Sequence, residues 1–135
     1  MGSCDKEENE KIQLNITNVE LIDVGKIHYE FNFQSVLKEN INDNNVYKCI
    51  IRTLDITKGD SIKSIDAYIK GDELTIYVNS YPNNFFDCFD ESCNCFDETC
   101  FTVHDLSFYL YGLKQQKYKM TIYVNYRTSV LTYNF

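Results

Sequence analysis

The sequence of 135 residues has no tryptophan, one proline, five glycines and two histidines. So little proline and glycine, beside 11 tyrosines and nine phenylalanines, excludes a collagen-like or intrinsically disordered chain. The net charge of −7 argues against a general binder of nucleic acid or of an anionic membrane surface. Unbroken apolar runs are too short to span a bilayer. This length and composition are typical of one globular domain with a single core.

Motifs of catalysis are also missing. The sequence has no Gly-rich phosphate loop, no Gly-x-Ser-x-Gly elbow and no His-Glu-x-x-His helix. His28 falls in a predicted strand and His104 stands at the start of another, where a structural role is favoured over metal ligation. We therefore expect a protein that is not an enzyme and that uses no cofactor. A hydrolase whose carboxylates meet only in three dimensions is an alternative.

The dominant hydrophobic period is two, which is the strand signal. The clearest hairpin spans residues 65–78, with Gly71 and Asp72 as its two-residue turn. This turn fixes the register on both faces. The expected pairs are Ile65 with Val78, Ala67 with Ile76, Tyr68 with Thr75, Ile69 with Leu74, and Lys70 with Glu73.

Further strands are predicted at residues 12–24, 27–33, 46–54, 106–110, 118–126 and 129–135, with a polar loop at 36–45. Cys49 should be a small buried residue of the third of these strands. Seven to eight strands with short turns predict an all-β antiparallel β-sandwich; a closed barrel is the alternative. The many strand tyrosines are interpreted as half-exposed sheet residues, although they also suit a carbohydrate- or protein-binding surface: Tyr68, Tyr77, Tyr109 and Tyr123.

One local pattern sharpens this prediction. Residues 110–113 read Leu-Tyr-Gly-Leu, and Tyr118 opens the next strand. The pattern resembles the tyrosine corner of immunoglobulin-like and fibronectin-type domains. The resemblance implies an immunoglobulin-like sandwich in which the hydroxyl of Tyr118 bonds back to the connection that precedes its strand.

Residues 1–10 form a polar, charged leader that contains Cys4 after Gly2 and Ser3. This stretch resembles the lipobox and acidic tether of a bacterial lipoprotein of Bacteroidota type, although no hydrophobic signal segment precedes it here. Further along the chain, Cys93-Asn94-Cys95 and the residues at 104–108, 112–113 and 118–122 also resemble the Cys-rich segment and following hairpin of small envelope lipoproteins of that group. The resemblance implies lipidation of Cys4, a membrane as partner, and a location in the cell envelope, anchored to the outer membrane. An arbitrary exposed cysteine is the alternative.

A seven-residue repeat, Cys-Phe-Asp-Glu-Ser/Thr-Cys, lies in a long loop at residues 81–101. Its four cysteines are favoured to form two disulfides in an oxidising compartment. The repeat suggests Cys88 with Cys93 and Cys95 with Cys100, although three connectivities exist. The same four cysteines also fit a metal site, but their spacing differs from that of structural zinc sites.

A shorter motif, Asp60-Ser61-Ile62, resembles the O-glycosylation site of Bacteroidota envelope proteins and makes Ser61 a candidate for modification. The sequence as a whole therefore predicts a leader at 1–10 and one domain at 11–135. We expect a lipid-anchored envelope protein that binds no nucleic acid, with a binding or structural role toward a protein or carbohydrate partner. A metal-binding protein is the alternative.

Overall fold

The computed structural model describes residues 10–25, 30–41, 44–56, 60–81 and 103–135. Every residue placed in a regular element there belongs to a strand, which confirms the all-β class. Within these ranges no helix has the length and hydrophobicity needed to cross a membrane. Several residues singled out above lie outside the described ranges, namely Cys4, His28, Cys88, Cys93, Cys95 and Cys100.

Eight strands form a single mixed, curled sheet in the order β2-β3-β6-β1-β4-β5-β7-β8. Seven neighbouring pairs make up this order, and all are antiparallel except β5 with β7, which run parallel. The strands are β1 (Ile12–Gly25), β2 (Asn32–Ile41), β3 (Asn44–Thr53), β4 (Ser61–Lys70), β5 (Glu73–Tyr81), β6 (Val103–Leu113), β7 (Lys117–Val124) and β8 (Arg127–Asn134).

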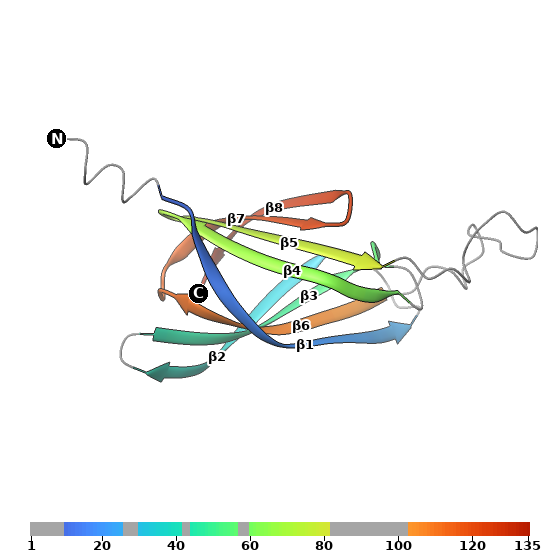
Figure 1. Ribbon diagram of the computed structural model, residues 1–135, viewed down its shortest axis with the longest axis horizontal. Helices are drawn as coiled ribbons and strands as arrows, with labels where there is room; N and C mark the ends of the chain where they lie inside the picture. The colour runs from blue at the N-terminus through green and yellow to red at the C-terminus, as the bar shows by residue number, and fades with distance from the viewer. Residues whose placement is uncertain (1–9, 26–29, 42–43, 57–59, 82–102) are drawn as a thin grey trace, which may run out of the picture.

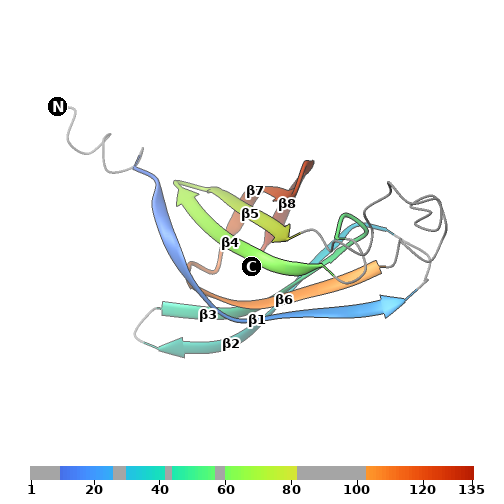
Figure 2. The same cartoon turned by 45° about the vertical axis from the view of Figure 1, so that its right-hand side comes forward.

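The long strand β1 belongs to both halves of the sheet. Ile12 to Leu14 pair with β4, whereas Asn15 to Gly25 pair with β6. A register shift follows Thr17, where Asn18 adopts a positive φ of 55°. Figures 1 and 2 show β1 crossing from the layer of β4, β5, β7 and β8 to the layer of β2, β3 and β6. We call these layers half-sheet A and half-sheet B.

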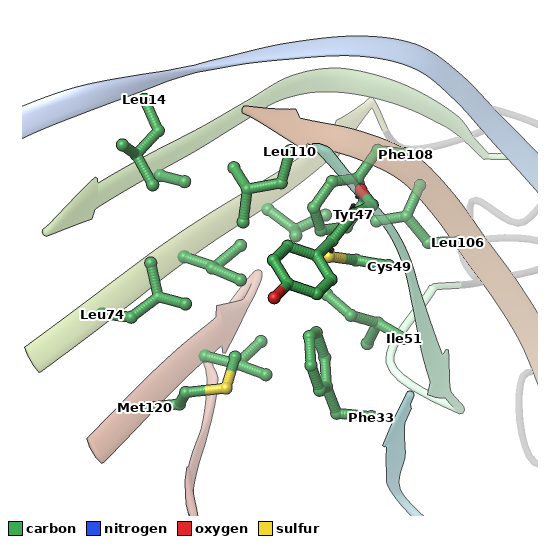
Figure 3. Close-up of a cluster of buried hydrophobic side chains, with 14 of the residues drawn as sticks. Leu14, Phe33, Tyr47, Cys49, Ile51, Leu74, Leu106, Phe108, Leu110 and Met120 are labelled. Carbon is green, nitrogen blue, oxygen red and sulfur yellow. Dashed lines mark hydrogen bonds between the residues drawn. The ribbon is translucent and has the colours of Figure 1, made fainter. Parts of the chain in front are cut away.

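The core lies between the two half-sheets. Alternate residues of β3, β5, β6 and β7 point inward, as the burial of every second side chain shows. Each fully buried aliphatic or aromatic side chain contributes about 1.5–3 kcal/mol of burial free energy. Figure 3 shows the centre of this cluster. Its members with no exposed surface include Cys49, Ile51, Leu74, Ile76, Leu106, Phe108, Leu110, Met120 and Ile122.

The predicted hairpin is confirmed as β4 and β5. All five expected pairs occur, and Gly71 has a positive φ of 62°, as its turn requires. Strands predicted at 46–54, 106–110 and 118–126 correspond to β3, β6 and β7, and Tyr47, Leu106 and Met120 of these strands point into the core. The hydroxyl of Tyr118 accepts a hydrogen bond from the backbone N–H of Lys114 at 3.1 Å, as the tyrosine-corner resemblance implied.

The prediction of a polar loop at residues 36–45 is wrong. Strand β2 occupies 32–41 and β3 begins at Asn44, so most of that stretch is strand. Because β2 is the outermost strand of half-sheet B, residues from Val36 to Asn40 are exposed and its pattern is mostly polar. The strand predicted at 27–33 begins only at Asn32 within the described residues. Tyr126, predicted to continue β7, lies instead in the turn before β8 and is fully exposed.

Aromatic side chains join the two ends of the strand order. Tyr133 of β8 packs edge-on against Phe33 of β2, with ring centroids 4.8 Å apart. Its hydroxyl accepts hydrogen bonds from the backbone N–H and the hydroxyl of Ser35, at 3.0 and 2.9 Å. Phe135 also packs on Phe33 and on Tyr47. Half-sheets A and B therefore contact each other at both β1 and the β2–β8 junction.

Candidate functional site

A polar depression of about 620 Å³ lies beside the start of β4. Besides Lys63 and Ser64 of β4 itself, its lining comes from three other parts of the chain, namely Asp55 and Asp60 between β3 and β4, the end of β5, and the turn between β7 and β8. The lining side chains offer carboxylate, ammonium, amide, hydroxyl and phenol groups. They are Asp55, Asp60, Lys63, Ser64, Asn79, Ser80, Asn125 and Tyr126.

Asn125 links the parts of the chain that line this depression. Its side-chain Oδ1 accepts the backbone N–H of Ser80 at 3.0 Å, and its Nδ2 donates to the backbone carbonyl of Asp55 at 3.0 Å. The backbone N–H of Asn125 donates to the carbonyl of Val78 at 2.8 Å. Asn125 has a φ of 55°, a left-handed conformation that asparagine tolerates better than most residues. One turn residue thus fixes the relative positions of all three parts.

Other polar groups in and around the depression form hydrogen bonds with one another. Asn79 Nδ2 donates to Ser64 Oγ at 3.2 Å, and the hydroxyl of Ser80 donates to Asp60 Oδ2 at 3.4 Å. Asp55 accepts from the hydroxyl of Thr53 at 3.2 Å. These bonds orient donors and acceptors around the depression before any ligand arrives, which is the condition for selective polar recognition.

The electrostatic balance of the polar depression is nearly neutral. Two carboxylates, Asp55 and Asp60, and one ammonium, Lys63, line it. Arg127 Nε lies 3.4 Å from Asp55 Oδ1 and offsets one of the two negative charges. Among the described residues, no group of three or more His, Cys, Asp or Glu side chains is placed to hold a metal ion. The balanced charges of the lining therefore suit an uncharged polar molecule.

A second depression of about 570 Å³ adjoins the first. The two share Asp60, Lys63 and Ser64. It opens where β1 leaves β4 to pair with β6, and a register shift between Ile62 and Ser64 bends β4 there. We call it the apolar depression, because half of its lining consists of hydrophobic side chains of β1 and β4: Val19, Leu21, Ile62 and Ile65.

Tyrosines form a separate row on the outer face of half-sheet A. Tyr77 and Tyr123 stack with centroids 4.9 Å apart and an interplanar angle of 5°, and Tyr68 meets Tyr77 edge-on at 6.0 Å. Lys11 Nζ lies 4.6 Å from the centroid of Tyr68. The rings thus cover one another's faces, and their packing supports the interpretation as half-exposed sheet residues. Tyr109 belongs to half-sheet B and is not part of this row.

Three of the residues singled out from the sequence can be placed. Ser61 is exposed at the start of β4 and lines the apolar depression. Cys49 is buried with no exposed surface, and burial raises the pKa of its thiol well above the ordinary value of 9.0. His104 is 3% exposed within β6, between Asp23 of β1 and Thr53 of β3.

Sequence reasoning missed the residues of the polar depression. Asp55, Asn79 and Asn125 are far apart in the chain, and none stands in a motif that marks a binding site. The one usable signal was the pair Asn125-Tyr126 between two alternating segments, which is typical of a tight turn. That signal locates the turn, but it does not reveal that the turn meets the end of β5.

Comparison of the chain with protein-family models, with curated proteins and with solved structures gives no match.

Proposed function

We propose that this chain is a non-enzymatic binding module whose ligand is a neutral carbohydrate, held in the polar depression. One observation carries the proposal: the depression combines a near-neutral charge with closely spaced donors and acceptors and an exposed aromatic ring. A sugar ring carries hydroxyls that both donate and accept hydrogen bonds, and it has apolar C–H faces that pack on aromatic rings. A volume of about 620 Å³ suits one or two sugar rings.

Five of the lining residues have a defined role in this proposal. Asp60 and the amide oxygen of Asn79 accept hydrogen bonds from sugar hydroxyls, and Lys63 donates to them. Tyr126, with 102% of its reference surface exposed, offers its ring to a C–H face. The adjoining apolar depression takes an acetamido methyl or a deoxy position of a longer ligand. Asn125 shapes the site and does not contact the sugar.

The test is a titration of the isotope-labelled protein with neutral oligosaccharides of hexose and N-acetylhexosamine, followed by NMR. Binding is expected with a Kd of about 0.1–1 mM, because the site is open and the contacts are mainly polar. Amide shifts should change at Asn79, Ser80 and Asn125. Tyr126→Ala should weaken binding about tenfold, and it should leave folding intact because the ring is fully exposed.

A matched control is Val36→Ala, which removes another exposed side chain from the opposite half-sheet and should leave binding unchanged. Absence of shift changes at about 10 mM of every sugar would contradict the proposal. Shift changes confined to the tyrosine row of half-sheet A would also contradict it, because they would place the ligand on the tyrosines and not in the polar depression.

We further propose that the module is anchored to the outer membrane of a bacterial envelope through lipid on Cys4. The residues that support this are the lipobox-like Gly2-Ser3-Cys4 and the charged leader that follows it. The experiment is detergent partitioning of the protein expressed from its full upstream reading frame. Cys4→Ala should move the protein into the aqueous phase. Partitioning that is unaffected by this change would rule out the anchor.

The Cys-rich segment at residues 81–101 is proposed to be closed by two disulfides, which the repeated Cys-Phe-Asp-Glu spacing and an oxidising compartment favour. Intact mass measured with and without reductant distinguishes this from a metal site. Two disulfides make the chain about 4 Da lighter than its reduced form. A fully reduced mass together with bound zinc would replace the disulfide proposal with the metal-binding one.

An immunoglobulin-like architecture is proposed for the domain on the Tyr118–Lys114 hydrogen bond and on the two facing half-sheets. An experimental structure tests it directly. Two sheets that separate along β1, with the strand connections of an immunoglobulin domain, would support it. An experimental structure in which β1 stays paired with both β4 and β6, as in the single curled sheet described above, would rule it out.

A further inference from the structure

The two outermost strands of the sheet differ in how their free edges are protected. On β2, the register shifts between Leu37 and Glu39, and the charged side chains Lys38 and Glu39 stand at the shift. The N–H of Ser35 is occupied by the hydroxyl of Tyr133. Bulges, edge charges and occupied backbone groups are the devices that prevent an edge strand from pairing with another chain.

Strand β8 has none of these devices. Its pairing with β7 runs from Arg127 to Asn134 without a register shift. After Arg127, the residues of β8 carry no charge and include no proline. Val130, at the middle of the strand, is 64% exposed, the largest value for an apolar strand residue in the described part of the chain. An uncharged, regular and exposed edge of this kind is suited to pairing with a further strand.

The backbone groups that face this edge can be identified. Phe135 N–H donates to the carbonyl of Gln116 at 3.0 Å, in register with the β7–β8 pairs. Because hydrogen bonding alternates along an antiparallel pair, every second residue back from Phe135 also bonds to β7. The residues between them point their N–H and C=O groups away from β7. Those residues are Thr128, Val130, Thr132 and Asn134.

We propose that β8 pairs antiparallel with β8 of a second copy of this chain, with the twofold axis at Val130. Val130 then faces Val130 of the partner subunit, and Thr128 faces Thr132 of the partner subunit. The pairing forms about six backbone hydrogen bonds between the two edges and joins two threonine pairs and one valine pair, which are favourable across strands. The same surface contacts itself, as a closed dimer requires.

Charge also favours a second copy as the occupant. In this register the one charged residue of the paired segment, Arg127, faces Tyr133 of the partner subunit, so no like charges meet. A register centred on Leu131 would instead place Val130 opposite a threonine and leave the valine pair unformed. The segment 128–132, Thr-Ser-Val-Leu-Thr, can thus pair favourably with an antiparallel copy of itself when the pairing is centred on Val130.

Sedimentation equilibrium over about 5 µM to 1 mM tests the proposal, since an edge-only interface should dissociate with a Kd of about 10–100 µM. Val130→Lys places two ammonium groups at the twofold axis and should weaken association at least tenfold at low salt. Val130→Pro removes only an N–H that faces the free edge, and it should weaken association independently of charge. Circular dichroism and thermal unfolding check that both variants fold.

The matched control is Val36→Lys, which changes an equally apolar residue that is 55% exposed on the protected edge of β2. It should leave the dimer constant unchanged. A wild-type protein that stays monomeric up to 1 mM would overturn the proposal. Association that responds to Val36→Lys and not to the Val130 variants would overturn it as well, since the interface would then lie on β2.

Discussion

The hydroxyl of Tyr118 and the backbone N–H of Lys114, four residues earlier in the chain, lie 3.1 Å apart. Tyr118 is 1% exposed and opens β7 next to the parallel strand β5. The bond therefore ties the connection between β6 and β7 to the core, at the point where the chain passes from half-sheet B to half-sheet A.

Tyr118→Phe should lower the free energy of unfolding by about 1 kcal/mol, because it removes one hydrogen bond and leaves the N–H of Lys114 without its partner. Urea denaturation followed by circular dichroism measures the change. Tyr126→Phe is the control, since the Tyr126 side chain is fully exposed, and its midpoint should match that of the wild type. Equal midpoints for both variants would mean that the Tyr118 bond adds nothing to stability.

Tyr47→Phe should have the opposite effect. The Tyr47 hydroxyl is buried and has no hydrogen-bond partner among the described residues, and Figure 3 shows its ring at the centre of the core cluster. Burial raises the pKa of this phenol. Removing an unsatisfied hydroxyl should raise the free energy of unfolding by up to about 1 kcal/mol. The same urea experiment measures it, and a loss of stability would reveal a partner for the hydroxyl.

Gly71→Ala should lower the free energy of unfolding by about 1–2 kcal/mol, because Gly71 has a φ of 62° that a Cβ atom disfavours. Gly71→Asn is the matched variant, since asparagine adopts this conformation more readily, and it should recover about half of the loss. Thermal unfolding of the two variants side by side measures the difference. If the Ala and Asn variants have the same thermal stability, the positive φ at residue 71 is not the reason for the loss.

The role of Asn125 can be divided into two parts. Asn125→Gly keeps the positive φ and removes the side-chain bonds to Ser80 and Asp55, which should lower the free energy of unfolding by about 1–2 kcal/mol. Asn125→Ala adds a backbone penalty of about 1 kcal/mol to that loss. Urea denaturation ranks the three proteins, and a glycine variant as stable as the wild type would show that the side-chain bonds are dispensable.

The Cys49 thiol should make stability depend on pH above about 9. Its pKa is raised in the folded state, so the folded protein holds a proton that the unfolded chain releases near its ordinary pKa of 9.0. This contribution is complete below pH 9 and is lost as the pH rises. At pH 10 the free energy of unfolding should be about 1.4 kcal/mol lower than at pH 7 from this group alone.

Cys49→Ala should remove that part of the slope. The measurement is a set of urea denaturation curves between pH 7 and pH 10 for the two proteins, compared as a difference so that other groups cancel. A wild-type curve parallel to that of Cys49→Ala would mean that the thiol ionises equally in both states.

The parts of the fold that could be predicted from the sequence are those in which a short turn sets the pairing of adjacent strands. A two-residue turn at Gly71-Asp72 and strict alternation on both sides determine the β4–β5 pairs. Alternation likewise identifies the inward residues of β3, β6 and β7. The part of β2 from Val36 onward was missed because both of its faces contact solvent and its sequence is mostly polar, which local pattern cannot distinguish from a loop.

Local sequence pattern could not predict which strands pair when they are distant in the chain. β5 and β7 lie side by side and parallel because β6 leaves to pair with β1 and β3, and no property of β5 alone encodes this. The polar depression arises in the same way, because Asp55, Asn79 and Asn125 meet only after half-sheet A has formed. Of the residues singled out beforehand, Ser61 lies in the adjoining depression.

The division of β1 between two half-sheets has a consequence for the order of folding. Ile12 pairs with Ile69 and Asn15 with Tyr111, so β1 makes its contacts across long stretches of chain, whereas β4 and β5 are joined by a two-residue turn. Closing such long loops carries an entropy penalty that local hairpins avoid. On a ribosome, β1 emerges first and is among the last to dock, because both of its partners must be synthesised before it can pair.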